Sequence, residues 1–521
     1  MQACVFLGFL AFYMSTIVIG CGGTGNRVIR ASLYWIAAGA RLRDKECIYP
    51  VLVDADTTGS ALSACDATLA NYINVSTGYS GKIFPANLGR LTHFRKWHPQ
   101  TGQGPLSVRK SLSGHDEAEL LMQACFSPLE LKQEITGGFF GRPALGAGSM
   151  KRQIKSADRN DFWSRFERQP EVSSAKRFVL TGSIFGGTGA ATMPFIIERL
   201  RDSFPNARIS VVLLLPYFTF DFSPEQKRLA ESEGHLLPEP DQFMGNALVA
   251  MDQYLDKLSG SIDDIYIIGD SHPENNNLSR GIVSQRLGSR VGISRGGADQ
   301  RTPMFFHDML AGSAILDVLQ RSEAPGRPAE RNVYIAGVDP MKIGWSQLPS
   351  PCVFSTSAEN SHALAVFSRF TYLALLLVDP WLSKKGVDEA DERRIPFIAD
   401  LHSDHAGNLI WKQMAEFLHG FREALLDIEV NSGTTAKENG FIHFDAWSRH
   451  MASPTLNRIE AAAQFAGVVK ELRVRRGSLV GTWNSLCEPV GGFADLTNRL
   501  YDLAEANLFG TAESNLPKSS K

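Results

Sequence analysis

The sequence predicts an α/β fold in which helices cover both faces of a parallel sheet. Short apolar segments alternate with helical ones over residues 17–270, and two of the apolar segments run directly into glycine-rich turns. Strands of a parallel sheet are buried on both faces, so they are continuously apolar. With 521 residues, 44% of them hydrophobic and 21% charged, the chain is long enough for several globular domains, and its composition excludes a disordered chain or a coiled coil.

The elements follow one another in an order typical of such a sheet. Strands are expected at residues 17–19, 49–53, 177–181, 208–215 and 264–268, and helices at 26–38, 191–203 and 241–258. After a polar, glycine-rich stretch come a helix at 304–320, a strand at 332–338, and helices at 363–377 and 411–428. We therefore expect an apolar extension (1–13), a first domain (14–300), a core helix (301–322) and a helix-rich α+β C-terminal domain (323–521).

The first twenty residues allow two interpretations. Residues 18–21 resemble a lipoprotein cleavage box, but no Lys or Arg precedes the apolar run, as a signal peptide requires. The favoured alternative is a buried strand at 15–19, because a phosphate-loop pattern follows it. The seven cysteines form no CxxC pair and the net charge is -2, so a reducing, cytoplasmic setting is expected, with no clear signal for nucleic acid or a membrane.

The first glycine turn stands between a predicted strand and a predicted helix. It consists of Gly20, Cys21, Gly22, Gly23, Thr24, Gly25 and Asn26. Glycines let backbone amides approach a phosphate closely, and the helix N-terminus adds a partial positive charge. The next strand ends at Asp54 and Asp56, where an acid commonly holds a ribose hydroxyl. Capping of a turn by these acids is an equally open interpretation.

A second glycine turn also joins a buried strand to a helix. Its candidate ligand-binding residues are Gly182, Ser183, Gly186, Gly187, Thr188, Gly189 and Ala190. A dinucleotide fold needs only one such turn, so two of them predict that both close over a single polyphosphate. The pattern GxxxxGK[ST] does not occur, which excludes a P-loop.

Together the two turns resemble the nucleotide loops of the tubulin/FtsZ superfamily. Their sequence patterns, GCGGTG and a later SxxGGTG, are most similar to those of its bacterial tubulin-like branch. The GGTG at residues 186–189 is similar to the superfamily's signature loop. Four further residues lie where that family contacts its nucleotide: Arg142 and Pro143 near the terminal phosphate, Pro216 on the ribose side, and Asn246 at the guanine base. Asp308, near the start of the core helix, is also placed at the base, where a carboxylate can accept from guanine.

The resemblance implies binding of GTP or GDP and self-association head-to-tail, which produces filaments when the contact does not close. Mg²⁺ would be held mainly by phosphate oxygens and water, so no protein metal site is expected. Hydrolysis in the family needs an acidic loop after the core helix. Here residues 321–326 read RSEAPG and do not match it, so GTPase activity is possible and no catalytic residue is assigned.

Three other functions are compatible with parts of the sequence. The first glycine turn with Asp54 and Asp56 also resembles the ATP-binding start of ThiF-like and ubiquitin-activating adenylating enzymes, and an NAD-dependent dehydrogenase would use the same pattern. Neither explains the second turn. The third is a nucleotide-bound scaffold that does not hydrolyse. Nothing in the sequence selects among division, positioning and defence as the cellular role.

Overall fold

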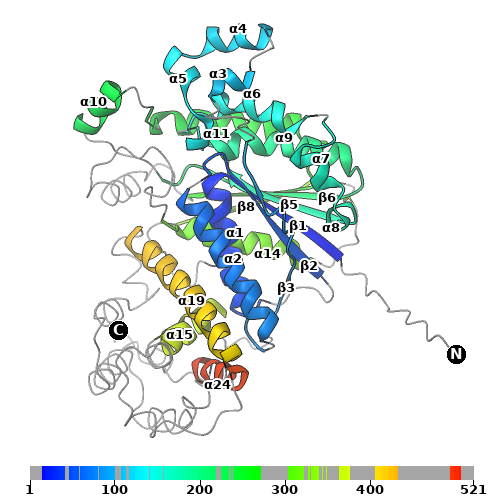
Figure 1. Ribbon diagram of the computed structural model, residues 1–521, viewed down its shortest axis with the longest axis vertical. Coiled ribbons are helices and arrows are strands. Elements are labelled where there is room, and N and C mark those ends of the chain that lie inside the picture. Colours follow the sequence, from blue (N-terminus) through cyan, green and yellow to red (C-terminus); the bar gives the residue numbers. More distant parts are fainter. Residues whose placement is uncertain are drawn as a thin grey trace, which may run out of the picture.

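In the computed structural model, a single parallel sheet organises the part of the chain that is described (Figure 1). Residues 14–40, 46–57, 59–79, 81–99, 107–112, 116–139, 141–156, 158–218, 224–233, 236–237, 239–270, 303–321, 327–328, 330–339, 343, 348, 363–375, 405–431 and 493–505 are described. The strands are β1 (Met14–Cys21), β2 (Glu46–Val53), β3 (Asn87–Leu88), β4 (Lys96–Trp97), β5 (Arg177–Ser183), β6 (Arg208–Leu214), β7 (Asp264–Asp270) and β8 (Asn332–Val338). Their order is β3-β2-β1-β5-β6-β7-β8, and β4 also pairs with β2.

The register of the central strands determines where the glycine turns lie. Cys21, the last residue of β1, is paired with Val53 of β2 on one side and with Gly182 of β5 on the other. All these pairings are parallel, so the three strands end at the same edge of the sheet. Ligands of open parallel sheets bind at this edge, in the loops that follow the strands.

Helices lie on both sides of the sheet (Figure 1). On one side are α1 (Gly22–Ala37), α2 (Ser60–Gly78), α14 (Phe306–Gln320) and α19 (His405–Asn431). On the other are α6 (Pro143–Ile154), α9 (Thr188–Ser203) and α11 (Phe243–Asp252). The remaining segments are α3 (Val108–Leu112), α4 (Asp116–Cys125), α5 (Pro128–Lys132), η1 (Ile135–Gly137), α7 (Phe162–Glu167), α8 (Pro170–Ser173), α10 (Pro224–Glu233), η2 (Pro240–Gln242), η3 (Gln253–Lys257), α15 (Ala363–Leu373) and α24 (Phe493–Glu505).

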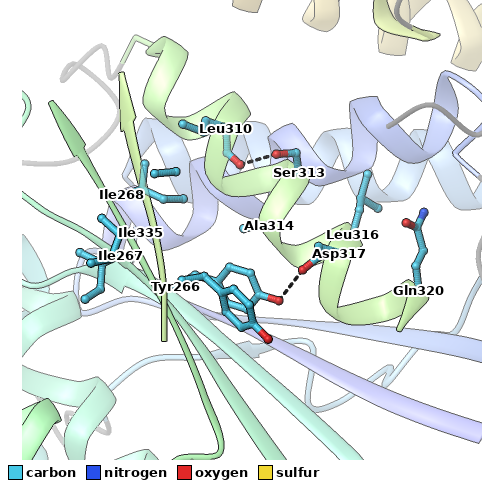
Figure 2. A pocket seen from close by; sticks show the side chains of 12 residues that line it. Tyr266, Ile267, Ile268, Leu310, Ser313, Ala314, Leu316, Asp317, Gln320 and Ile335 are labelled. Carbon is cyan, nitrogen blue, oxygen red and sulfur yellow. Dashed lines mark hydrogen bonds between the residues drawn. The ribbon is translucent and has the colours of Figure 1, made fainter. Parts of the chain in front are cut away.

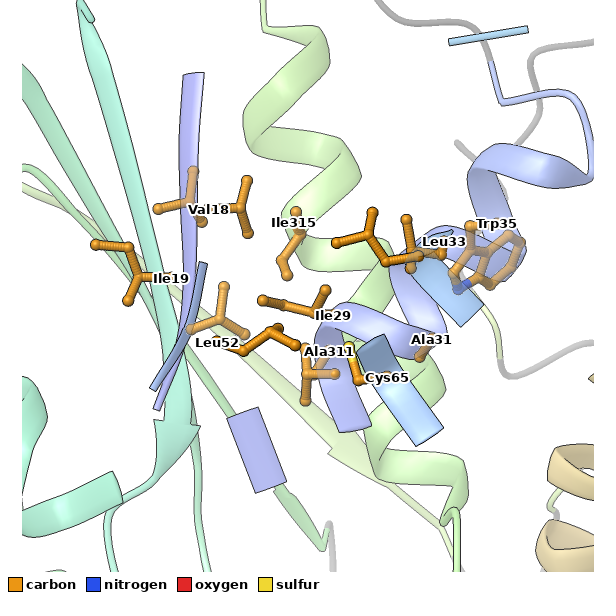
Figure 3. Packing of buried hydrophobic residues seen from close by; sticks show 14 of the residues in the cluster. Val18, Ile19, Ile29, Ala31, Leu33, Trp35, Leu52, Cys65, Ala311 and Ile315 are labelled. Carbon is orange, nitrogen blue, oxygen red and sulfur yellow. The ribbon is translucent and has the colours of Figure 1, made fainter. Parts of the chain in front are cut away.

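The helix α1 is buried on nearly every side, because the sheet, α2 and α14 surround it (Figure 3). A methyl group at Gly312 of α14 would lie 2.8 Å from the amide nitrogen of Ser32, so the two helices touch backbone to backbone. The indole nitrogen of Trp35 donates to the carbonyl of Met309 (2.9 Å). The helix that follows the first glycine turn is therefore held rigidly against the helix that crosses the sheet.

The helix α19 joins the C-terminal part of the chain to this core. Its apolar face packs against α2, and Phe421 contacts Tyr34 of α1 at a ring distance of 5.1 Å. Arg30 of α1 donates to the carbonyl of Gly420 (2.9 Å). At its far end the carboxylate of Asp427 accepts from the amide of Met304, just before α14.

The predicted α/β class and parallel sheet are confirmed, and the six predicted strands are present within a few residues of their expected ends. The expected helix at 241–258 is instead a 3₁₀ turn, α11 and a π-helical segment at 253–257. The strand at 332–338 pairs with β7 and so extends the sheet of the first domain. The expected extension (1–13) and the polar stretch after β7 lie outside the described residues. No helix in the described ranges is both long and apolar enough to cross a bilayer.

Candidate functional site

The two glycine turns touch each other. A methyl group on Gly22 would lie 2.8 Å from the amide nitrogen of Gly189, and one on Gly189 would lie 2.8 Å from the carbonyl oxygen of Cys21. Two turns that are far apart in the chain therefore form one continuous backbone surface at the carboxyl ends of β1 and β5. This is the arrangement expected if both serve one ligand.

The glycines of the first turn are there for different physical reasons. Gly22 has a φ of +72°, which strongly favours glycine. Gly20 and Gly25 press against each other, and Gly25 also presses against the carbonyl of Thr181 in β5, so a side chain at either glycine would separate α1 from the sheet. A methyl group on Gly23 would meet only Ala61, at 3.7 Å. Packing within the chain does not require glycine at 23, whereas close approach of a ligand to the backbone would.

Each turn ends in a helix whose N-terminus has no side-chain cap. The helices α1 and α9 are both 16 residues long, and neither has an acidic residue in its first turn. The flanking residues Cys21 and Gly187 make no capping hydrogen bond from a side chain. The first amides of a helix have no partner inside the helix, and together with the helix dipole they attract an anion. Two such termini in contact make a strong candidate anion site.

A third turn lies against the second. A methyl group on Gly187 would be 3.2 Å from the amide nitrogen of Gly141, just before Pro143 begins α6. Gly138 and Gly141 both have positive φ values, of 83° and 75°. Asn246 on α11 fixes this contact, because its side chain donates to the carbonyls of Gly141 (3.0 Å) and Phe185 (3.4 Å). Three of the predicted loops are thus brought together.

Asp54 is buried below the two turns. The side-chain amide of Asn26 donates to its carboxylate through Nδ2 (3.3 Å), and the backbone nitrogen of Asp56 also donates to it (3.2 Å). Burial, with the charge of Asp56 nearby, raises the pKa of Asp54 to about 7, although a hydrogen bond with Thr188 of the second turn opposes that shift. No described group donates to the Oδ1 atom of Asn26, which is buried at the start of α1. The floor of the site therefore contains a carboxyl group that is readily protonated and an acceptor without a partner.

Asp308 is surrounded by protein groups, whereas a contact with the guanine base would need an accessible carboxylate. It is fully buried, and Arg27 of α1 binds it at 2.8 Å through Nε. Tyr217 donates to its other oxygen (2.8 Å) and the amide of Phe305 donates to Oδ2 (2.9 Å). Burial opposes the charge on Arg27, yet Asp308 and Tyr217 keep the pKa of this guanidinium above its usual value. A base could reach the carboxylate only if one of these partners gave way.

Arg142 points toward acids rather than toward the turns. It donates to the carbonyl of Leu237 (2.7 Å) and forms ion pairs with Glu239 and, at 3.4 Å, with Glu130. Pro216 follows β6 at the same edge of the sheet as the turns. The structure therefore brings the two glycine turns, Asp54 and Asn246 together, and it gives Arg142 and Asp308 partners of their own.

An aromatic cluster beside the second turn was missed by sequence reasoning. Its rings are those of Phe185, Tyr217, Phe218, Phe243, Phe305 and His307. Phe218 and Phe305 stack at 5.5 Å with an angle of 15°, and the guanidinium of Arg27 lies 5.8 and 5.7 Å from their centres. These residues come from four separate segments, so only the fold assembles them. The signal in the sequence was the run of aromatics after β6 and before α14.

Comparisons with solved structures find CetZ proteins. The chain matches CetZ from Methanosaeta thermophila with 13% identity over 54% of this chain and 57% of that one, at a TM-score of 0.23. It matches a GTPγS-bound protofilament of CetZ2 from Haloferax volcanii with 13% identity over 59% and 58% of the two chains, at a TM-score of 0.27. The chain thus spans a little over half the length of each. No family model and no curated protein sequence matches it.

Proposed function

We propose that the chain is a GTP-binding protein of the tubulin/FtsZ type, with the nucleotide phosphates held between the two glycine turns. The observation that carries the proposal is the contact between Gly22 and Gly189, since it makes one anion site from two helix N-termini. A dinucleotide-binding or adenylating enzyme would need only the first turn. The second turn, with the sequence GGTG, would then have no reason to adjoin it.

The donors present fit a polyphosphate. Backbone amides at the starts of α1 and α9 would bind phosphate oxygens, and the hydroxyls of Ser183 and Thr188 could add hydrogen bonds. The open space beside Gly23 would let a phosphate approach the backbone closely. Bound Mg²⁺ would neutralise phosphate charge, held mainly by phosphate oxygens and water.

The protonation state of Asp54 would depend on the bound ligand. A carboxylate beside phosphates is repelled unless it is protonated or a cation lies between them. Because the pKa of Asp54 is raised to about 7 before any ligand binds, the group can hold its proton near neutral pH. Its backbone neighbour Asp56 is partly exposed and remains the better candidate for the ribose or for water around the cation.

Selection of guanine over adenine rests on the resemblance to the family. Asn246 lies next to the second and third turns, where it also holds two carbonyl groups. Asp308 lies at the start of α14 in its network with Arg27 and Tyr217. We propose Asn246 as the first candidate for a base contact and Asp308 as one that would act after its network rearranges.

Assembly and turnover are separate parts of the proposal. Head-to-tail association would place the turns of one copy against the far end of the next and form filaments. The loop after α14 lacks the family's acidic pattern, so we propose binding and assembly with slow or absent hydrolysis. Sedimentation and electron microscopy with GTP, with GDP and without nucleotide would test assembly directly.

The site is tested by titrating purified protein with GTP and Mg²⁺ in a calorimeter. Thr188→Arg should abolish binding, because a long side chain would enter the space between the turns. Thr77→Arg, the same substitution at an exposed position of α2, is the matched control and should bind as the wild type does. Unchanged affinity in Thr188→Arg would remove the site. Binding of ATP with pyrophosphate exchange would instead favour an adenylating enzyme.

A further inference from the structure

A cavity of about 190 Å³ lies between α14 and the strands β7 and β8 (Figure 2). Its sheet wall contains Tyr266 and Tyr334, and its helix wall contains Leu310, Ala314 and Asp317. None of the lining residues belongs to the glycine turns. The cavity is therefore separate from the proposed nucleotide site.

Small residues create this cavity. Leu310, Ser313, Ala314 and Asp317 recur at the spacing of one helix face, and that face looks onto β7 and β8. Ser313 and Ala314 carry short side chains where a core helix would commonly carry Leu or Ile, and Ala336 is equally small on the strand side. The space is partly open, since Ile335 in its lining is 79% exposed, so a small molecule could enter it without unfolding of the sheet.

The lining favours an uncharged ring. Tyr266 and Tyr334 stack at 4.6 Å with an angle of 24°, and the guanidinium of Arg321 lies 4.1 Å from the centre of the Tyr334 ring. Asp317 is the one carboxylate among the lining residues, and it already binds Arg321 (2.6 Å) and the hydroxyl of Tyr266 (2.6 Å). The hydroxyl of Ser313 donates to the carbonyl of Leu310 (2.6 Å). The walls thus offer apolar surface and two tyrosine rings, with no unneutralised charge for an ionic ligand.

We propose that this cavity binds a small, uncharged, planar apolar molecule of about the size of indole. An apolar cavity of about 150 Å³ in another protein stays dry and takes up benzene, so the volume here suffices for a somewhat larger ring system. Hydrophobic contact with the apolar walls and with the two tyrosine rings supplies the attraction.

A ligand in the cavity would also change the affinity of the nucleotide site for its ligand, a consequence that rests on the proposed function. Leu310 lines the cavity, and Asp308, one half-turn earlier on α14, binds Arg27 of α1. A ligand that shifts α14 relative to β7 and β8 would move this ion pair. If the two sites are coupled, each ligand must change the affinity for the other by the same factor.

The test is calorimetric titration of the full chain with indole, without nucleotide. The wild type should bind indole, and indole-3-carboxylate, which differs by one charged group, should bind at least tenfold more weakly. Ala314→Leu fills the cavity from the helix and should abolish binding of indole while the protein stays folded. Ala336→Ile fills the cavity from the strand, and it provides an independent test if Ala314→Leu does not fold. Ala124→Leu on the exposed face of α4 is the matched control and should bind as the wild type does.

Three results would overturn the proposal: no binding of indole by the wild type, equal binding by wild type and both filled variants, or equal affinity for the charged analogue. Each is measured without GTP, so it is independent of the nucleotide assignment. A titration of GTP with and without saturating indole then tests the coupling alone. An unchanged GTP affinity would remove the coupling and leave the indole site standing, whereas absence of GTP binding would count against the proposed function.

Discussion

Arg27 and Asp308 form a buried ion pair that ties α1, the helix at the first glycine turn, to α14, the helix that crosses the sheet. The Nε–Oδ2 distance is 2.8 Å and both side chains are almost fully buried. Tyr217 hydrogen-bonds to both partners, so the pair is fully satisfied. Any movement of α14 relative to the first turn must therefore disturb this network.

Asp308→Ala should lower the free energy of unfolding by about 3–5 kcal/mol, because it leaves the guanidinium of Arg27 buried without its partner. Urea denaturation measures this. The double variant Arg27→Met, Asp308→Leu should recover most of the loss, since apolar side chains can replace a buried pair at little cost. If Asp308→Ala were as stable as the wild type, the pair would contribute nothing and the carboxylate would be free for another role.

Gly22→Ala should destabilise the protein by at least about 1–2 kcal/mol, the usual cost of a left-handed conformation in a residue with a Cβ atom. The added methyl group would also press on the amide of Gly189 and separate the turns. The same change at Gly245, where a methyl group meets nothing within 4 Å, should instead be neutral or stabilise α11 by about 0.5–1 kcal/mol. Thermal unfolding of both variants checks this, and equal effects would contradict the contact between the turns.

Asp54 should make the protein less stable as pH rises. Its pKa is about 7 in the folded chain and about 4 when unfolded, so between these values only the folded state keeps the proton. The free energy of unfolding should therefore fall from pH 4 to pH 7, by up to about 4 kcal/mol, and stay level above that range. Urea denaturation at several pH values, compared with Asp54→Asn, isolates this contribution.

Asp54→Asn should lose this pH-dependent difference, since an amide does not titrate. Stability curves for the two proteins that run parallel from pH 4 to pH 8 would show that Asp54 ionises normally. If the cation lies near Asp54, bound GTP and Mg²⁺ should lower the pKa of this group. The wild type and Asp54→Asn should then differ less in the pH dependence of their free energies of unfolding, which the same denaturation series measures.

The helix α19 should be indispensable to the first domain. Phe421 is fully buried between Tyr34 of α1 and Phe367 of α15, so Phe421→Ala should cost about 3–5 kcal/mol. Leu409 lies on the same helix with 58% of its surface exposed, and Leu409→Ala should change stability by less than about 0.5 kcal/mol. Equal losses in both variants would mean that the two faces of α19 are not distinguished in solution.

Strand positions were predictable because buried parallel strands are continuous apolar runs, and residues 211–214 of β6 (Val-Val-Leu-Leu) are the clearest example. Helix starts were harder. The first helix begins at Gly22 rather than at 26, since the glycine turn itself forms its first turn. The π-helical segment at 253–257 was not predicted, and it contains Tyr254, which is fully buried.

Within the candidate site, the glycines could be found from spacing, but their contact could not, because it depends on the register of β1 against β5. The partners of Arg142 and Asp308 were equally hidden. Charged side chains are assigned to ligands from sequence by analogy, whereas the fold decides which acid or base lies within reach. The burial that raises the pKa of Asp54 is a tertiary effect of the same kind.

The strand β8 determines where the protein can be truncated without exposing an edge of the sheet. It completes the sheet at the edge of β7, although it is encoded after the core helix, at the start of what reads as a separate part of the chain. A fragment that stops at the end of α14 would lack Tyr334 and would expose the whole edge of β7 together with the ring of Tyr266, and we expect it to aggregate. An N-terminal fragment that is meant to fold on its own should therefore extend through residue 339. It should also be combined with α19, either in the same polypeptide or as a separate, co-expressed fragment.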